Sequence, residues 1–191
     1  MPLQVSMRGG NGITVPYGAI FDGVRKNRGF TDVRGRPDAA AQITEGGESK
    51  ALHDLLVCIA GKDVYFSLGC DLGCHPEPES AAAQRQVAGG YIQFAAINYS
   101  NATTAQYDGL CKAMMPELRK RVGSCHWRIE IVGTWVKFCL PNEPTTTSPS
   151  MWMWFFATAR TKAKAVASRE KLIGAISDVL HMSDVASTLL K

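Results

Sequence analysis

The most strongly apolar stretch of the chain is residues 151–157, in its last third. Side chains alternate along a strand, so Trp152, Trp154 and Phe156 are predicted to share one face, with the methionines between them on the other. Neither face is polar, which predicts a strand that is covered on both sides. The apolar run that continues to Ala159 is about half of a membrane span, since a spanning helix needs about 20 apolar residues. A buried strand is therefore predicted, and no contact with a membrane.

Two helices are predicted between this strand and the C-terminus. Ser168 is a suitable N-cap for the first, and Ser183 is a suitable N-cap for the second. The first helix is expected to cover one face of the apolar strand, because its apolar residues recur at the spacing of a single helix face. This stripe consists of Leu172, Ile173, Ile176, Val179 and Leu180.

The rest of the chain is predicted to alternate between strands and helices. Residues 37–47 and 70–90 are expected to be irregular, and residues 141–150 form a polar loop with three prolines. The predicted elements are a hairpin at 3–15 around the turn 9–12, strands at 19–24, 63–69, 91–99, 125–132 and 135–140, a turn or bulge at 133–134, a helix at 49–60, and a helix capped by Thr103 or Thr104 that Pro116 kinks or restarts.

These elements predict an α+β fold in one domain, residues 1–191. It consists of an antiparallel β-sheet with an N-terminal hairpin, helices packed on one face and two closing C-terminal helices. Residues 1–47 form a basic, glycine-rich segment and residues 48–191 the sheet-and-helix core. A strand–strand–helix unit used twice is also indicated, because residues 64–68 resemble 136–140 and residues 91–94 resemble 152–155, although matches this short also arise by chance.

Composition and charge narrow the class of protein. The chain has 191 residues, 46% of them hydrophobic and 20% charged, which is typical of a folded protein. No signal peptide is recognised at its start, so the six cysteines are expected to be reduced in a cytoplasmic setting. The net charge of +4 resides in residues 1–36, which hold six basic and two acidic residues. Such a segment suits contact with phosphates or forms a solvated surface.

Candidate chemistry is sparse. Cys70, Cys74 and His75 lie close together in sequence, and Cys125 with His126 is the candidate pair to complete a zinc site. The usual pairs of cysteines two residues apart are absent, so no bound metal and no cofactor are predicted. The motifs of serine hydrolases, P-loop proteins and zinc proteases are also absent. We therefore predict no catalytic residue and a protein that is not an enzyme.

The order of strand, proline-bearing loop, strand and two closing helices at residues 134–191 resembles the coat proteins of single-stranded RNA bacteriophages. The resemblance covers about sixty residues and is one of pattern, since the family offers no invariant motif. It implies a capsid protein that assembles into a virion through interlocked dimers, in the host cytoplasm. Each subunit would lay its helices over the sheet of its partner. The implied dimer interface consists of Trp152, Trp154, Phe156, Leu172, Ile176 and Val179.

The resemblance also implies binding of genomic RNA by the opposite surface of the sheet. The candidate RNA-binding residues are Arg128, Lys137, Arg160, Lys162 and Lys164. The loop between the last two strands would contact neighbouring subunits, through Asn142, Pro144, Thr146 and Pro149. Two other functions remain open: an RNA-binding module that does not assemble, and a small cysteine-dependent hydrolase or deamidase.

Overall fold

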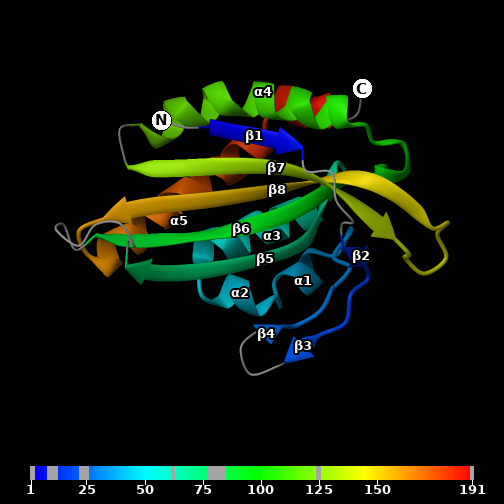
Figure 1. Ribbon diagram of the computed structural model, residues 1–191, viewed down its shortest axis with the longest axis horizontal. Coiled ribbons are helices and arrows are strands. Elements are labelled where there is room, and N and C mark those ends of the chain that lie inside the picture. The colour runs from blue at the N-terminus through cyan, green and yellow to red at the C-terminus, as the bar shows by residue number, and fades with distance from the viewer. Residues whose placement is uncertain are drawn as a thin grey trace.

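The computed structural model describes residues 3–7, 13–21, 26–61, 63–76, 85–123 and 126–189. The predicted α+β class is confirmed: a single mixed sheet carries its long helices on one face (Figure 1). In spatial order its strands are β5 (Tyr65–Pro76), β6 (Gln86–Ala96), β8 (Thr146–Ala159) and β7 (Trp127–Phe138), all antiparallel, with β1 (Leu3–Met7) and β2 (Thr14–Val15) along the outer edge of β7.

The predicted N-terminal hairpin is wrong. Strands β1 and β2 do not pair with each other; both pair in parallel with β7, where Leu3 lies opposite Ile129 and Val15 opposite Phe138. The outer edge of β7 offers a long row of unpaired backbone groups, and two short strands satisfy it better than they satisfy each other. The predicted turn at residues 9–12 lies outside the described residues. A separate two-stranded ribbon is formed by β3 (Ile20–Phe21) and β4 (Lys26–Asn27).

The alternation predicted for the apolar strand is confirmed. In β8, Met151, Met153 and Phe155 are buried on one face, under the helices, while the residues between them are only partly buried. Strand β7 alternates in the same way from Trp127 to Val132, as predicted, but it continues without a turn to Phe138. The predicted break at residues 133–134 does not form, because β8 pairs with β7 across its whole length.

Three helices cover one face of the sheet (Figure 1). Helix α5 (Lys162–Leu180) lies over the central strands β6 and β8, while α3 (Lys50–Ala60) lies on the β5 side and α4 (Thr104–Val122) on the β7 side. The predicted cap of α4 is confirmed, since Thr103 forms a capping box with Gln106. The N-cap of α3 is Ser49, whose hydroxyl accepts a hydrogen bond from the Leu52 amide at 3.1 Å. Helix α4 passes through Pro116 without restarting, held by its buried face.

Several predicted boundaries are wrong. Helix α5 begins six residues before Ser168, with Thr161 as its N-cap, because the alanine-rich turn between them is itself a good helix former. The expected loop at 70–90 is largely the hairpin of β5 and β6, of which residues 77–84 lie outside the described residues. The segment expected to be irregular contains α1 (Pro37–Ala40) and α2 (Thr44–Gly47). Two closing helices are present, as predicted, and the second is the short α6 (Ser183–Ala186).

The strand–strand–helix order occurs twice, as β5–β6–α4 and β7–β8–α5. The predicted match of 64–68 with 136–140 is not the structural one, because the equivalent strand β7 already starts at Trp127. Strands β6 and β8 pair in a register that sets Ile92 against Met153, so a twofold axis through this pair relates the two hairpins. The helices do not follow this symmetry, since α5 lies at the centre with α3 and α4 beside it.

The N-terminal segment covers one end of the other sheet face. Its side chains join a second, smaller apolar cluster there, separate from the main core beneath the helices. The buried members of this second cluster are Val15, Phe66, Leu68, Ala95, Tyr99, Val136, Phe138 and Leu140, with Tyr17 and Phe30 packed against them.

Candidate functional site

The sheet face turned away from α3, α4 and α5, here called the helix-free face, carries a group of aromatic side chains. Trp152, Trp154 and Phe156 lie on it because they alternate with the buried methionines of β8. All three are partly exposed, and neither apolar cluster of the described residues includes them. Large aromatic groups left partly exposed on a flat surface are typical of a binding site.

The strand β6 adds a fourth ring to this group. Tyr91 lies opposite Trp154 in the register, with ring centroids 4.7 Å apart, and stacks on Trp152 at 4.7 Å. The two tryptophan rings are 5.6 Å apart and nearly parallel, at 19°. Burial, and to a lesser extent the charge of Asp71, raise the pKa of Tyr91 above its ordinary value, so its hydroxyl stays neutral at physiological pH. The local axis between the hairpins passes beside Tyr91 and Trp152, which occupy equivalent positions.

Arg128 extends this group toward one end of the sheet. Its guanidinium lies over the Phe156 ring, 4.7 Å from the ring centroid, and its Nε is 3.2 Å from a carboxylate oxygen of Glu130. The side chain is 52% exposed, so part of its hydrogen-bonding capacity faces solvent. An arginine held against a ring in this way is preorganised for a planar or anionic ligand.

The predicted grouping of Arg128 with Lys137 is wrong. The two residues are nine positions apart on one unbroken strand, and an odd spacing places them on opposite faces. Lys137 therefore lies on the helix side, although beyond the helices, where it is exposed. The predicted separation of the dimer interface from the RNA surface fails as well, because Arg128 shares its face with Trp152 and Trp154.

Exposed basic residues gather at the end of the sheet where Arg128 lies. Arg160 follows β8 directly, and Lys162 and Lys164 lie in the first turn of α5. Arg85, which the sequence reading missed, precedes β6, whose first residue pairs with the last residue of β8. Arg85 is far from the other basic residues in the sequence. The pairing of β6 with β8 brings it to the same end of the sheet as Arg160.

The helical residues predicted to cover a partner subunit are buried within their own chain. Leu172, Ile176 and Val179 each have 0% exposure and belong to the main core. Their helix packs on the buried face of β6 and β8, opposite to the face that carries Trp152. The predicted exchange of helices between partners is therefore wrong, because this chain satisfies its own sheet.

The predicted assembly loop is shorter than expected. Thr146 and Pro149 belong to β8, and Pro149 is buried, whereas Asn142 and Pro144 remain exposed in the connection between β7 and β8. Asn142 adopts a φ of 64°, a left-handed conformation that asparagine tolerates better than most residues.

The same connection is tied to the N-terminal segment by a hydrogen-bonded network. The Arg34 guanidinium donates at 2.7 Å to both Asp32 and Glu143, and the Tyr99 hydroxyl donates to Glu143 at 2.5 Å. Burial alone would raise the pKa of Asp32, but the hydrogen bonds and charge of Arg34 outweigh it and hold that pKa below its usual value. Hydrogen bonds from Arg34 and then Tyr99 also lower the pKa of Glu143, while burial and then Glu143 raise the pKa of Tyr99 to about 12.

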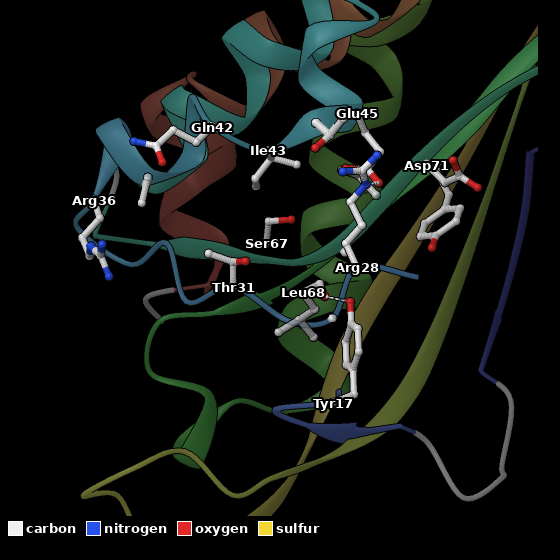
Figure 2. A pocket seen from close by; sticks show the side chains of 16 residues that line it. Tyr17, Arg28, Thr31, Arg36, Gln42, Ile43, Glu45, Ser67, Leu68 and Asp71 are labelled. Carbon is white, nitrogen blue, oxygen red and sulfur yellow. Dashed lines mark hydrogen bonds and ion pairs between the residues drawn. The ribbon is translucent and has the colours of Figure 1, made fainter. Parts of the chain in front are cut away.

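A cleft of about 690 Å³ lies along the outer edge of β5 (Figure 2). Residues 67–71 of β5 form one side, α1 and α2 another, and the N-terminal segment a third. Tyr17 closes one part of it by donating a hydrogen bond to the Leu68 carbonyl at 2.7 Å, and Arg28 reaches to within 4.0 Å of Glu45 across it. Arg36 lies at the opposite end of the cleft from Asp71 (Figure 2).

Five cysteines lie in the described part of the chain, and all five are free thiols. No three His, Cys, Asp or Glu side chains gather in the described ranges, and Cys125 lies outside them. Burial raises the pKa of both Cys70 and Cys111 to about 12, so neither is a thiolate at neutral pH. Cys58 contacts His181 Nδ1 at 3.4 Å, but that nitrogen lies 2.5 Å from the Ser177 carbonyl and must carry the proton, which leaves it unable to act as a base for the thiol.

Within the described residues, no helix has the length and apolar character needed to cross a membrane. Comparison with protein families, with curated proteins and with solved structures finds no match to this chain.

Proposed function

We propose that this chain is a viral coat protein that self-assembles and binds RNA on the helix-free face of its sheet. The observation that carries the proposal is the group of partly exposed rings of Tyr91, Trp152 and Trp154, with Arg128 over Phe156 beside it. Flat aromatic groups on a sheet are suited to unstacked bases, since every base has a face that can stack. In this proposal the protein resides in the virion, and in the host cytoplasm before assembly.

The basic end of the sheet supplies the electrostatic part of binding. Arg85, Arg128, Arg160, Lys162 and Lys164 all lie there and all are exposed. Cations of this kind neutralise phosphates and release counterions, which makes binding depend on salt. Bases would stack on the aromatic group while the backbone follows this end. Double-stranded RNA does not offer such faces, so the arrangement favours single strands and hairpin loops.

Assembly in this proposal does not use exchanged helices, because α5 covers the sheet of its own chain. It uses instead the exposed part of the connection between β7 and β8, around Asn142 and Pro144. Arg34 and Tyr99 fix Glu143 in the same connection, so little conformational freedom is lost when it docks.

A pair of tryptophan variants tests the RNA site. Trp152→Ala removes a ring of the aromatic group, whereas Trp135→Ala removes a tryptophan that is 40% exposed on the other face of the sheet. Loss of one stacking ring costs about 1–3 kcal/mol, so Trp152→Ala should weaken binding of a single-stranded oligonucleotide about 5- to 150-fold. Trp135→Ala should leave it unchanged. Equal binding by the two variants in a fluorescence anisotropy titration overturns the RNA site.

A pair of charge variants tests the basic end. Arg160→Glu should lower the salt dependence of binding, because each phosphate contact on a single strand contributes about 0.7 to the slope of log K against log salt. Lys171→Glu changes an exposed lysine in the middle of α5 and serves as the control. Sedimentation of the purified protein tests assembly, since a coat protein should form a large particle.

A second function, an RNA-binding module that does not assemble, is favoured by one observation. The chain buries the apolar face of its helices without a partner, so it has no need of an obligate dimer. A protein that binds the oligonucleotide in the way described and sediments as a monomer supports this second function.

A further inference from the structure

The cleft along β5 contains a buried hydroxyl that the chain itself does not use. Ser67 lines the cleft and is only 4% exposed. Its hydroxyl shares no hydrogen bond with any of the described residues. Buried polar side chains are nearly always hydrogen-bonded, so an unpaired hydroxyl in the wall of a cleft indicates a ligand that supplies the partner.

Two arginines of the basic N-terminal segment flank this hydroxyl. In the view of Figure 2, Ser67 lies between Arg36 and Arg28. The Arg28 side chain is 55% exposed, and its Nε is 4.0 Å from Glu45, the outer limit of an ion pair. Arg36 is exposed and forms no ion pair within the described part of the chain. Guanidinium groups bind phosphates through two parallel hydrogen bonds, so this part of the cleft suits a phosphate group.

The end of the cleft opposite Arg36 is acidic. Asp71 lies there, and in the same view Glu45 lies on the Asp71 side of Ser67. One Asp71 oxygen accepts a hydrogen bond from the Leu72 amide at 2.8 Å, and no cation among the described residues pairs with this carboxylate. Carboxylates repel phosphates but accept hydrogen bonds from amino groups and hydroxyls. The cleft therefore fits an asymmetric ligand, with a phosphate at one end and hydrogen-bond donors at the other.

The backbone of β5 is not free to pair with a peptide in this cleft. The Tyr17 hydroxyl already donates to the Leu68 carbonyl at 2.7 Å, and Asp71 already binds the Leu72 amide. An added peptide strand depends on such main-chain groups for its affinity, whereas a small ligand needs only the side chains that line the cleft. The cleft volume of about 690 Å³ lies within the range of small-molecule sites, about 300–1,000 Å³.

We propose that this cleft binds a nucleoside monophosphate. The phosphate lies between Arg36 and Arg28 and accepts a hydrogen bond from Ser67. The ribose hydroxyls and the amino group of the base donate to Asp71 and Glu45, as carboxylates elsewhere bind ribose and base amino groups. The inference goes beyond the proposed function and does not depend on it, because it uses neither of the tryptophans of the aromatic group.

Isothermal titration calorimetry of the nuclease-treated protein with adenosine monophosphate tests the site. Saturable binding is expected. Adenosine and inorganic phosphate each lack one end of the ligand, so each should bind at least about 10-fold more weakly, because a single hydrogen bond to a charged group contributes about that factor. The proposal is overturned if adenosine monophosphate shows no saturable binding at millimolar concentrations, or if either fragment binds as tightly as the whole nucleotide.

A pair of arginine variants tests the phosphate position. Arg36→Gln should weaken the binding of adenosine monophosphate about 10-fold and leave the binding of adenosine unchanged. Arg119→Gln changes an exposed arginine of α4, on the β7 side of the sheet, and should leave both unchanged. Equal weakening of nucleotide and nucleoside by Arg36→Gln would place the phosphate elsewhere and overturn the proposed orientation.

Ser67→Ala separates a role in binding from a role in folding. The variant should weaken the binding of adenosine monophosphate about 2- to 12-fold, the range for one hydrogen bond. Its urea midpoint should not fall, because the hydroxyl has no partner among the described residues of its own chain. Wild-type affinity, or a loss of affinity that comes with a loss of stability, overturns the contact with Ser67.

The nucleotide has two sources to distinguish, the free molecule and the phosphorylated end of an RNA strand. Tyr91 lines the cleft and stacks on Trp152, so the cleft adjoins the aromatic group. A single-stranded oligonucleotide with a terminal phosphate should displace adenosine monophosphate if the strand supplies the nucleotide. Simultaneous binding of both supports the free molecule as the ligand.

The cleft site and the RNA site fail separately. Trp152→Ala should leave the binding of adenosine monophosphate unchanged. A protein that binds the oligonucleotide through Trp152 but binds no nucleotide overturns the cleft site and leaves the RNA site standing. Nucleotide binding that depends on Arg36, in a protein whose oligonucleotide binding is insensitive to Trp152→Ala, supports the cleft site and overturns the RNA site.

Discussion

Arg34→Met should destabilise this protein by about 2–4 kcal/mol at neutral pH. The guanidinium bonds two carboxylates, Asp32 and Glu143, and lies 5.1 Å from the centroid of the Phe66 ring. Hydrogen bonds to charged groups contribute about 1.5–3 kcal/mol each when shielded from water. The side chains of Arg34, Asp32 and Glu143 are 21%, 38% and 33% exposed. Solvent screening therefore reduces the combined stabilisation from the two carboxylates to the lower end of what two such hydrogen bonds can contribute.

The effect should also depend on pH in a defined direction. The folded-state pKa values of Asp32 and Glu143 are lowered, so their contribution is fully present above their unfolded values and is lost as the pH falls through the folded ones. The ordinary values are about 4, so the difference between wild type and Arg34→Met should be largest near pH 7 and shrink below about pH 4.

Urea unfolding followed by tryptophan fluorescence measures both effects. The matched control is Lys112→Met, which removes an ion pair with Asp108 whose side chains are 77% and 53% exposed, and which should change stability far less than Arg34→Met does. If Arg34→Met is as stable as Lys112→Met at pH 7, or if its deficit grows on acidification, the network does not hold the N-terminal segment as described.

Three further predictions concern packing and reactivity. Leu172→Ala should lower the free energy of unfolding by about 2–5 kcal/mol, because it leaves a cavity in the core of its own chain. The melting temperature of this variant should not depend on protein concentration. A clear concentration dependence in calorimetry would instead support helices exchanged between partners. Gly90→Ala should destabilise the protein by about 1–3 kcal/mol in urea, because its Cβ would lie 2.2 Å from the Asp71 carbonyl oxygen, whereas Gly73→Ala has open space and should be neutral. Cys111, whose pKa burial raises to about 12, should resist alkylation at pH 8 until the protein unfolds, and rapid labelling detected by mass spectrometry would contradict its burial.

The sequence by itself determined the elements whose signals are local. The alternation of Trp152, Met153 and Trp154 reflects a period of two that any strand obeys, and the structure keeps it. The N-caps Ser49 and Thr103 satisfy backbone amides within three residues of themselves, so their role is also readable without a fold. The same period did not separate Arg128 from Lys137 in advance, because the sequence predicted a break between them and only the pairing with β8 makes that strand continuous.

Only the tertiary structure decided which segments meet. The N-terminal strands pair with β7 rather than with each other because the free edge of a distant strand satisfies more of their backbone groups. Helix α5 covers its own sheet, which no periodicity distinguishes from covering a partner's sheet. Arg34 and Glu143, 109 residues apart, and Arg85 beside the end of β8 are brought together in the same way. Hydrophobic pattern and capping act over a few residues, whereas these contacts depend on which edges and faces remain unsatisfied once the whole chain has folded.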